Sequence, residues 1–331
     1  MVNEERFNRH ELISPMDEPL GEGLIDRCVL SSLLQKHDAR KCIPTAVCWP
    51  CSAPALAGAL ESMEAGHIEP ILVAPELVLR AIARSEGLNI DSCRFLEASN
   101  EEDAAAKSTE LCRTGRAAAL MKGSLHTDLL MHFVLQKDGG LRTSRRVSHV
   151  YVIEAPLYDR TIFITDAAIN IYPALEEKVD IVQNAIDLAH ALGVTNPKVA
   201  ILSAVETVSA KITSTIDAAA LCKMADRGQI VGATLDGPLA FDTAVSAQAA
   251  QVKQLQSPVA GVADILVVPD LESGNMLAKQ LEYLGGASLA GIVLGAKVPI
   301  ILTSRADSAE SRVASCAIAS LLVTKKENCP S

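Results

Sequence analysis

Residues 162–203 read IFITDAAINIYPALEEKVDIVQNAIDLAHALGVTNPKVAILS, and this stretch holds the pattern that decides the fold. Two short apolar runs, Ile162–Thr165 and Lys198–Ser203, flank a longer segment over Tyr172–Gly193. In that segment the apolar residues recur at steps of three and four, Pro173 stands in the first turn, and a glycine ends the pattern. These features predict an amphipathic helix between two strands.

The same alternation of short and long segments extends over most of the chain. The short runs that predict strands share an apolar, mostly β-branched composition: Thr45–Cys48, Pro70–Ala74, Ala117–Met121, His149–Val152, Ile162–Thr165, Lys198–Ser203, Gln229–Leu235, Ile265–Val268 and Pro299–Thr303. Runs that are apolar through their length are typical of strands buried on both faces of a mainly parallel sheet. Strands that alternate with helices predict a doubly wound α/β architecture.

Length, composition and charge restrict the kind of protein. The chain has 331 residues, which favours two domains, and it is 49% hydrophobic with few aromatic residues. A net charge of −10 without a run of Lys or Arg argues against a nucleic-acid or anionic membrane surface. Nine cysteines without dense, even spacing fit reduced thiols. The charged N-terminus lacks an apolar leader, and the longest apolar stretch, Ala287–Leu302, is interrupted by Lys297 and Pro299. We therefore expect a soluble, cytoplasmic protein.

A change in composition marks the expected domain boundary. Residues 137–148, KDGGLRTSRRVS, combine Gly-Gly with four positive charges and no apolar periodicity, which predicts a linker or crossing loop. The C-terminal segment is too short for a domain of its own, so we expect it to return to the first one. The predicted domains are residues 1–145 plus 294–331, and residues 146–293.

The most conspicuous local motif is Cys48-Trp49-Pro50-Cys51. A Cys-x-x-Cys pair between a strand and a helix is how thioredoxin-like redox sites are built, because the helix N-terminus stabilises a thiolate. The length of the chain and the Ala/Leu-rich helix that follows favour the other interpretation, two small thiols that are buried or half-buried. No His pair or second Cys pair stands at zinc spacing, so we expect no metal site.

The common phosphate-binding and nucleophile motifs are absent from the sequence. It contains no G-x-G-x-x-G, no G-x-x-x-x-G-K-[ST] and no G-x-S-x-G. A standard dinucleotide domain, a P-loop ATPase and a typical serine hydrolase are therefore disfavoured. Any phosphate must be bound in another way.

Thr303–Ser308, TSRADS, follows an apolar strand and precedes a helix expected over Ala306–Leu322. A polar turn between a strand and a helix N-terminus offers backbone N–H groups to an anion, and the Arg305 guanidinium suits a phosphate. The same spacing fits a capping box, with Ser304 as the N-cap and Asp307 as its partner. From the residues alone, both interpretations stay open.

Polar turns also follow the predicted strands Ile162–Thr165, Lys198–Ser203, Gln229–Leu235 and Ile265–Val268. Because open α/β sheets bind ligands at the carboxyl ends of their strands, we expect these turns to meet the Thr303–Ser308 turn. The Asp-Gly-Pro segment at residue 236 by itself is ordinary turn chemistry. The candidate substrate-binding residues in these turns are Thr165, Asp166, Ser203, Asp236 and Asn275.

In order and spacing, these segments together resemble the phosphate acetyl/butyryltransferase family, with the phosphate butyryltransferase branch nearest. The matching segments are Ile164–Ala168, Asn196–Ala200, Leu202-Ser203, Asp236–Leu239, Pro258–Asp264, Glu272–Asn275 and Thr303–Ser308. They cover the chain from the linker to the C-terminus. The residues before the linker match only loosely, around Lys122–Ser124 and His126-Thr127.

The resemblance implies an enzyme that moves a short-chain acyl group between coenzyme A and inorganic phosphate and so forms an acyl phosphate in a ternary complex. It also implies a two-domain α/β/α fold similar to that of isocitrate dehydrogenase, with the active site in the interdomain cleft. The family usually forms homodimers and needs no metal or nucleotide cofactor for the chemistry.

The resemblance also implies roles for the Thr303–Ser308 turn. Ser304 would donate to the oxyanion and Arg305 would hold the phosphoryl group, which suits donors at a helix N-terminus. The acetyltransferase branch has an aspartate as thiol base seven residues after the serine, where this chain has Ser311. At about 100° per residue, Ser308 and Ser311 would share a helix face with Ser304, and both are further candidate substrate-binding residues. As a substitute for this aspartate as thiol base, Asp307 is better placed than Glu310, because Asp307 lies closer to that helix face.

Several alternatives stay open from the sequence. Arg142, Arg145 and Arg146 are candidates for binding phosphate or coenzyme A, although solvated linker charges explain them as well. The enzyme could use acyl carrier protein instead of coenzyme A. The chain could also be a non-catalytic binding or redox-sensing protein that uses Cys48 and Cys51. Acyl chain length cannot be read from the sequence, because each methylene is worth only about 1–3 kcal/mol of selectivity.

Overall fold

The structure is a computed structural model that describes residues 29–35, 42–304 and 307–328. Within these residues the strands form one sheet in the order β3-β2-β1-β4-β11-β10-β5-β6-β9-β7-β8. The strands are β1 (Ile43–Cys48), β2 (Ile68–Val73), β3 (Arg94–Leu96), β4 (Ala119–Lys122), β5 (Ser148–Glu154), β6 (Ile162–Thr165), β7 (Lys198–Leu202), β8 (Thr234–Leu239), β9 (Ile265–Val267), β10 (Ser288–Leu294) and β11 (Ile300–Ile301).

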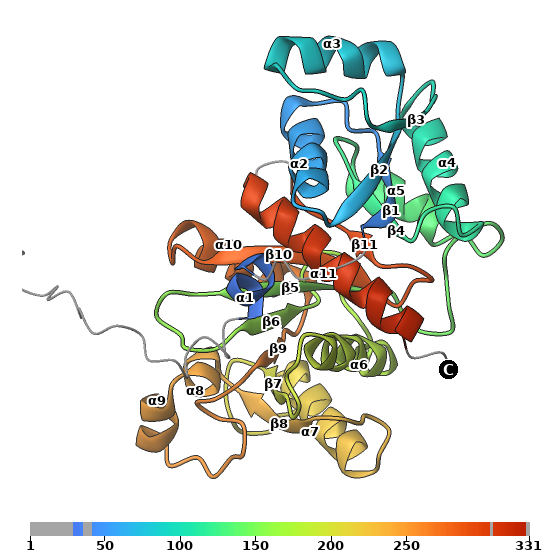
Figure 1. The fold of residues 1–331 in the computed structure, drawn as a ribbon. Coiled ribbons are helices and arrows are strands. Elements are labelled where there is room, and N and C mark those ends of the chain that lie inside the picture. Colours follow the sequence, from blue (N-terminus) through green and yellow to red (C-terminus); the bar gives the residue numbers. More distant parts are fainter. Residues whose placement is uncertain (1–28, 36–41, 305–306, 329–331) are drawn as a thin grey trace, which may run out of the picture.

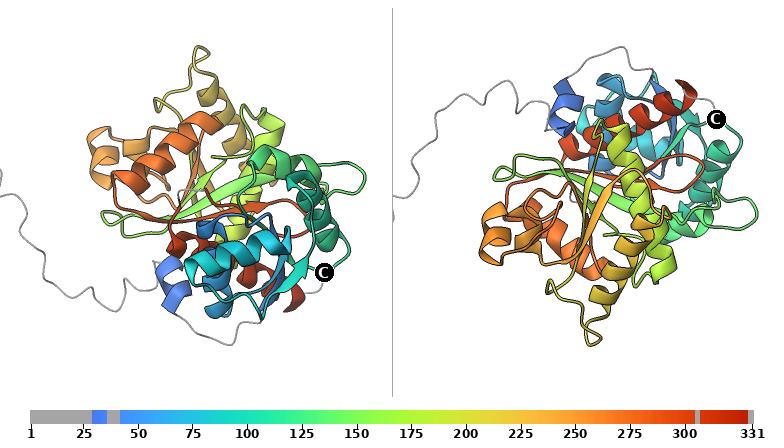
Figure 2. Two further views of the ribbon diagram at one scale, coloured as in Figure 1. Left: turned by 90° about the horizontal axis from the view of Figure 1, so that it is seen from above. Right: turned by 90° about the horizontal axis from the view of Figure 1, so that it is seen from below.

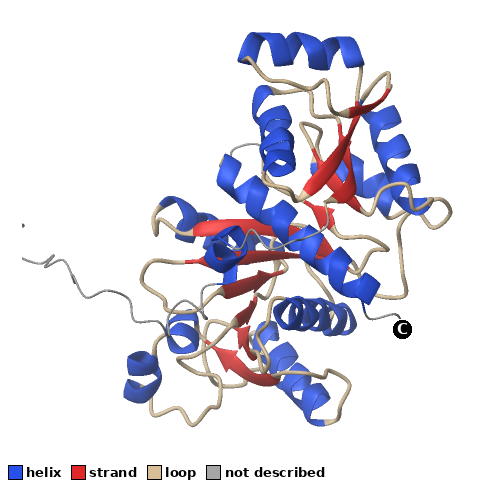
Figure 3. Cartoon of the chain, viewed as in Figure 1, coloured by secondary structure: helices blue, strands red, loops and turns tan. Residues whose placement is uncertain are grey.

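Helices cover both faces of this sheet (Figure 3). They are α1 (Val29–Gln35), α2 (Ala53–Glu64), α3 (Glu76–Glu86), α4 (Glu101–Arg113), α5 (Thr127–Val134), α6 (Leu175–Ala191), α7 (Thr213–Asp226), α8 (Phe241–Val245), α9 (Ala247–Val252), α10 (Leu271–Tyr283) and α11 (Ala309–Asn328). The helix predicted over Tyr172–Gly193 is α6. Its first turn carries Glu176 and Glu177, whose negative charges suit the helix dipole.

The sheet consists of two parallel groups joined by two antiparallel strands. In the first half, β11 pairs in parallel with β4, which belongs to the parallel group of β1, β2 and β3. In the second half, β6, β9, β7 and β8 are parallel. Between them, β10 is antiparallel to both β11 and β5, and β5 is antiparallel to β6. Figure 1 shows the two halves above and below this centre, with α11 crossing in front.

The hydrophobic core is continuous on one face of the sheet and divided on the other. One cluster includes buried residues of α1, α2, α6 and α11 and of strands from both halves. On the opposite face, one cluster lies under α4 and α5 and a separate one under α8 and α10. Figure 2 shows these two groups of helices apart from each other. The halves are therefore fused along one face and separated along the other.

One strand was not predicted, and another was predicted with wrong bounds. The predicted strand Pro299–Thr303 contains β11, but the apolar stretch Ala287–Leu302 also holds β10, because the chain reverses between the two strands at Gly295, whose φ is +82°. The strand expected over Gln229–Leu235 is β8, which starts only at Thr234 and continues through the Asp-Gly-Pro segment. A Cβ on Gly237 would lie 2.8 Å from the Ile201 side chain, so glycine allows β8 to approach β7 closely where a turn was expected.

The C-terminal segment packs against the first half of the chain. β11 pairs with β4, and α11 contacts α2. The domain bounds expected from the sequence, 1–145 plus 294–331 and 146–293, stay a prediction. Of the helices that the structure describes, none combines the length and apolar character that crossing a membrane requires.

Candidate active site

The loop after β11 is closed by a reciprocal contact between Ser304 and Asp307. The Ser304 N–H donates to Asp307 Oδ2 at 2.6 Å, and the Asp307 N–H donates to the Ser304 carbonyl at 3.3 Å. Asp307 therefore reaches back to Ser304, as the capping box predicted. The helix itself begins later, at Ala309, and the Ser308 hydroxyl accepts from the Ser311 N–H at 3.1 Å. Ser308 is thus the N-cap, and the assignment of Ser304 to that position was wrong.

Arg312 explains why the helix starts three residues later than predicted. Its guanidinium is buried and donates to the Asp307 carbonyl at 2.7 Å and to the Ser304 carbonyl at 3.2 Å. Because these two carbonyls accept hydrogen bonds from a side chain, they belong to a loop, and the helix starts only after it. Gly58 on α2 makes room for the arginine, because a Cβ there would lie 2.4 Å from its side chain. Arg312 was missed in the sequence, where a cation among the apolar positions of this helix was the signal that could have found it.

Asp307 is enclosed and lies near one cation. Its side chain is 0% exposed, and Oδ1 has no hydrogen-bond partner. Lys279 Nζ lies 3.7 Å from this oxygen and 3.4 Å from Glu282 Oε2, and it also stands over the Tyr283 ring. An unpaired buried carboxylate is costly, so the lysine stabilises the charge of Asp307. Lys279 was not identified from the sequence.

Helix α10 connects this loop to the turn after β6. Asn275 Nδ2 donates to the Ala167 carbonyl at 3.3 Å, and Lys279, four residues further on, reaches Asp307. Residues four apart lie on the same face of a helix. One face of α10 therefore contacts a turn from the second half and the loop that contains Ser304.

Asp166 shapes the turn that Asn275 contacts. The buried carboxylate accepts from the N–H groups of Ala168 at 2.9 Å and Ile169 at 3.0 Å, and from Asn170 Nδ2 at 2.6 Å. Burial raises the pKa of this carboxyl group, although these hydrogen bonds oppose the shift. Thr165 likewise donates inward, to the His149 carbonyl at 2.9 Å. In this structure both residues hold the turn in place.

The remaining predicted residues make their contacts elsewhere. The Ser203 and Ser214 hydroxyls are 2.9 Å apart, next to α7. Asp236 lies inside β8, not in a turn as predicted, and its carboxylate accepts from the Gly237 N–H. Ser308 and Ser311 are joined through their hydroxyls at 3.0 Å and line a cavity of about 180 Å³ with Glu282. Arg305 lies outside the described residues.

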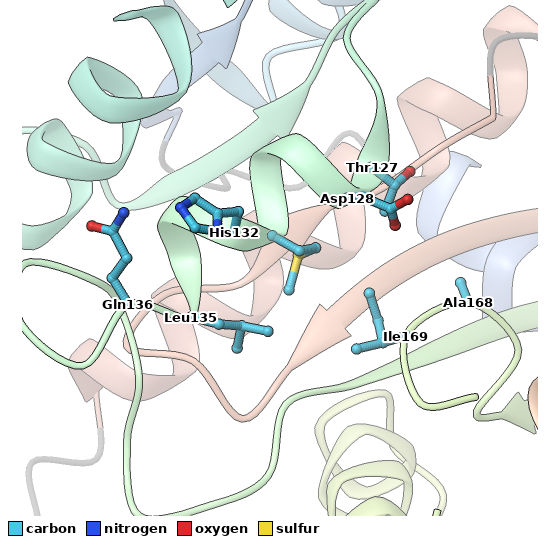
Figure 4. Close-up of a pocket in the computed structure, with 8 residues that line it drawn as sticks. Thr127, Asp128, His132, Leu135, Gln136, Ala168 and Ile169 are labelled. Carbon is cyan, nitrogen blue, oxygen red and sulfur yellow. The ribbon is translucent and has the colours of Figure 1, made fainter. Parts of the chain in front are cut away.

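A groove separates the two halves on the face where the core is divided. It has a volume of about 520 Å³ and runs between one side of α5 and the turn at Ala168 and Ile169 (Figure 4). A smaller cavity of about 210 Å³ shares Leu135 and Ile169 with it. The smaller cavity is also lined by the three arginines of the linker, Arg142, Arg145 and Arg146.

Two of these arginines are held by α6. Arg145 forms an ion pair with Asp187 and lies 3.5 Å from Asn184 Oδ1. Arg146 lies 2.6 Å from Glu177 and donates from Nε to Asn170 at 2.7 Å. These two side chains are therefore ion-paired as well as partly solvated, and their role in binding phosphate or coenzyme A stays a prediction.

The Cys48 and Cys51 thiols are not activated. Cys48 ends β1 and Cys51 lies shortly before α2, as predicted, and all described cysteines are free. Burial raises the pKa of Cys48 to about 12 and that of Cys51 to about 11. A thiolate is the reactive form, so the structure favours one buried and one half-buried thiol over a redox pair.

The loop with hydroxyl and carboxylate groups lies at the carboxyl edge of parallel strands, and a groove lies between the two halves. This arrangement is usual in α/β enzymes that bind small molecules. Residues 59–320 match the family described as "Phosphate acetyl/butaryl transferase". This match covers more than half of the chain, so the protein belongs to that family.

Individual relatives agree with this membership. The chain is 58% identical over 282 residues to a phosphate acetyltransferase of Rhizobium meliloti, covering 85% of this chain and 89% of that protein. It is 41% identical over 296 residues to a phosphate butyryltransferase of Clostridium acetobutylicum, covering 89% and 98%. The crystal structure of a branched-chain phosphotransacylase from Enterococcus faecalis V583 matches with a TM-score of 0.74 and 31% identity, covering 85% and 99%.

These findings confirm the family, the mainly parallel α/β fold and the enzyme class that the sequence predicted, a phosphate acyltransferase. The chain is more similar to the Rhizobium meliloti acetyltransferase than to the Clostridium acetobutylicum butyryltransferase. Identity therefore does not favour butyryl over acetyl as the acyl group.

The pKa values of the two thiols give a test of the redox alternative. We expect Cys48 and Cys51 to react with iodoacetamide at pH 7 roughly a hundredfold more slowly than glutathione, because so little thiolate is present. Peptide mapping by mass spectrometry measures the labelling. The Cys48→Ser/Cys51→Ser double variant should retain its turnover. A reversible Cys48–Cys51 disulfide that switches turnover would contradict this expectation.

Proposed function

We propose that the protein transfers a short-chain acyl group, acetyl or butyryl, between coenzyme A and inorganic phosphate. The proposal rests on the family and on one observation: the Ser304 loop stands at the carboxyl edge of β11 and is joined through α10 to the turn of the opposite half. This arrangement gives a site with contributions from both halves, as a reaction of two substrates requires. No metal or nucleotide cofactor takes part in the proposed reaction.

In the proposed reaction the coenzyme A thiolate attacks the carbonyl carbon of the acyl phosphate. A carbon–sulfur bond forms, the carbonyl oxygen becomes an oxyanion, and the carbon–oxygen bond to phosphate then breaks. The thiol proton goes to a base and inorganic phosphate leaves. The Ser304 hydroxyl is the proposed donor to the oxyanion, where a fixed donor lowers the barrier because it is already oriented. Asp307 and Arg312 hold the backbone of Ser304 in place.

Arg305 is the proposed clamp for the phosphoryl group, on the basis of its sequence position next to Ser304. Asp307 is the proposed thiol base. Its Oδ1 lacks a hydrogen-bond partner and could accept a proton, but the side chain is enclosed. A thiol reaches this oxygen only after the surrounding residues move apart.

Two further properties belong to the same proposal. We propose that the protein works as a homodimer, and exposed apolar side chains such as Tyr172 and Met276 offer a surface that a second copy could cover. We also propose that it works in the cytoplasm. The seven described cysteines are free thiols, which supports a reducing compartment.

The activity itself is tested by mixing the purified protein with coenzyme A and a series of acyl phosphates. We expect loss of free thiol and formation of thioester, at a rate that depends on acyl chain length. The kcat/KM values across acetyl, propionyl and butyryl phosphate identify the preferred acyl group. Turnover with acyl carrier protein but not with coenzyme A would replace this proposal by the carrier-protein alternative.

Ser304 can be tested without disturbing the helix, because Ser308 is the cap. We expect Ser304→Ala to lower kcat by about 10²–10³, the usual cost of losing one oxyanion donor. The urea midpoint should change little, and the KM for coenzyme A should stay similar. Ser85→Ala, at an exposed position of α3, is the control. Near-full kcat in Ser304→Ala would move the oxyanion donor to a backbone N–H of the same loop.

Asp307→Asn separates the charge of this side chain from its hydrogen bond. The amide oxygen can still accept from the Ser304 N–H, but it cannot take the thiol proton. We expect kcat to fall about 10²-fold at pH 7, the lower end of what general-base catalysis contributes. The loss should shrink at pH 9, because a thiol of pKa about 8.5 then ionises by itself. A loss that appears in Asp307→Ala but not in Asp307→Asn would show a positioning role only.

A further inference from the structure

We propose that Tyr151 limits the length of the acyl group, so that the protein prefers acetyl over propionyl and butyryl. This inference rests on the proposed function, because it takes an acyl phosphate as the substrate and the Ser304 loop as the place where its carbonyl group lies. It goes further in naming the side chain that selects among short acyl groups and the order of preference that follows.

The Tyr151 side chain lies at the centre of the sheet, on the face where the core is divided. β11, β10 and β5 are neighbours there (Figure 1). Tyr151 pairs with Gly291 of β10, and paired residues of antiparallel strands present their side chains on the same face. Tyr151 belongs to the core cluster under α8 and α10, whereas Val293, two residues beyond Gly291, belongs to the cluster under α4 and α5. The ring therefore stands where the two clusters meet.

Gly291 brings the start of the Ser304 loop close to this ring. A Cβ on Gly291 would lie 2.4 Å from the Leu302 carbonyl oxygen and 3.5 Å from Tyr151 Cε1. The Leu302 N–H donates to the Gly291 carbonyl at 3.3 Å and so holds the chain at this point. Because glycine has no side chain, the loop backbone and the ring can approach each other beside it. Ser304 follows Leu302 by two residues, so the proposed oxyanion donor lies in the same part of the molecule as the ring.

Charged groups of the candidate site face the Tyr151 hydroxyl. Burial raises the pKa of this hydroxyl, and the negative charges of Asp307, Glu282 and Asp166 raise it further. These carboxylates come from the Ser304 loop, from α10 and from the turn after β6. The phenol thus lies where the three elements that form the candidate site meet.

The proposed reaction directs the acyl chain toward this ring. When the carbonyl oxygen faces the Ser304 hydroxyl and the phosphoryl group is held beside it, the alkyl group is the remaining substituent, and it requires apolar surroundings. The Tyr151 ring supplies an apolar surface together with Ala167 and Leu289 of the same core cluster. Tyr151 is 5% exposed, so it forms the bottom of the site. The movement that opens Asp307 to a thiol also uncovers the ring.

The ring has little freedom to move aside for a longer chain. The fully buried His149 packs edge-on against it, with the ring centroids 4.3 Å apart. Closely packed interiors resist added methylene groups, because the surrounding side chains then leave their preferred rotamers. We therefore expect kcat/KM of the wild-type protein to fall about tenfold from acetyl to propionyl phosphate and again from propionyl to butyryl phosphate.

Truncation of the ring tests this inference. Tyr151→Ala removes the whole phenol, which is larger than the extra methylene groups of butyryl. We expect the ratio of kcat/KM for butyryl phosphate to kcat/KM for acetyl phosphate to rise at least about tenfold, the smallest factor that one methylene usually gives. Tyr151→Phe keeps the size of the ring and loses the hydroxyl, so it should keep the wild-type ratio. Initial rates of thioester formation give both values.

Tyr158→Ala is the matched control. Tyr158 packs against the same core cluster, but it lies between β5 and β6, where its hydroxyl donates to the Ala263 carbonyl at 2.7 Å. Its truncation loosens the same core without opening the bottom of the site, so the ratio should not change. Tyr151→Leu retains more of the packing than Tyr151→Ala and should raise the ratio in the same direction. Circular dichroism melts identify the variants that are folded.

A raised ratio in Tyr151→Ala or Tyr151→Leu, with the wild-type ratio in Tyr151→Phe and Tyr158→Ala, would support the assignment. An unchanged ratio in a folded Tyr151→Ala or Tyr151→Leu variant would overturn it. So would a wild-type preference for butyryl over acetyl phosphate, which needs no variant, or an equal change in Tyr151→Phe, which would assign the effect to the hydroxyl. If the wild-type protein forms no thioester from any acyl phosphate, the proposed function fails, and this inference fails with it.

Discussion

The pairing of β10 with β5 is the interaction on which the rest of the structure depends. All seven residues of Ser288–Leu294 pair with Ser148–Glu154 in antiparallel register. The other edge of β10 takes β11, which in turn lies parallel to β4. Through these contacts a segment near the C-terminus enters the sheet of the first half, and the Ser304 loop comes to the carboxyl edge shared by β4 and β11. The two halves form one sheet because their central strands are bonded to each other.

The position of the groove follows from how the helices cover this sheet. On one face, α6 and α11 contact each other and contribute to a single core that continues through both halves. On the other face, α5 and α10 belong to separate cores. Apolar side chains close the first face against water and leave an opening on the second. Ligand sites commonly form at such junctions, where polar groups from two bodies converge without a core between them.

Two buried or half-buried cations determine the shape of the Ser304 loop. Arg312 donates to the carbonyls of Ser304 and Asp307, and Lys279 lies beside the enclosed carboxylate of Asp307. Charges in such places are stable only where polar partners surround them. The contacts therefore restrict the loop to one arrangement, and they connect it to α11 on one side and α10 on the other. A hydroxyl that serves as an oxyanion donor benefits from a backbone that is already fixed.

The sequence by itself determined the α/β class, because the period of apolar residues separates buried strands from amphipathic helices. The order of its polar turns also identified the family. It did not determine that Ala287–Leu302 holds two strands, that Asp236 lies within β8, or that the helix after Ser304 starts at Ala309. Each of these depends on a contact with another part of the fold. β10 pairs with β5, Gly237 lies against Ile201, and Arg312 donates to the carbonyls of Ser304 and Asp307. The position of Lys279 beside Asp307 and the groove along α5 likewise depend on tertiary contacts. Local patterns record which face of a segment is buried, whereas only the tertiary structure decides which residues meet it there.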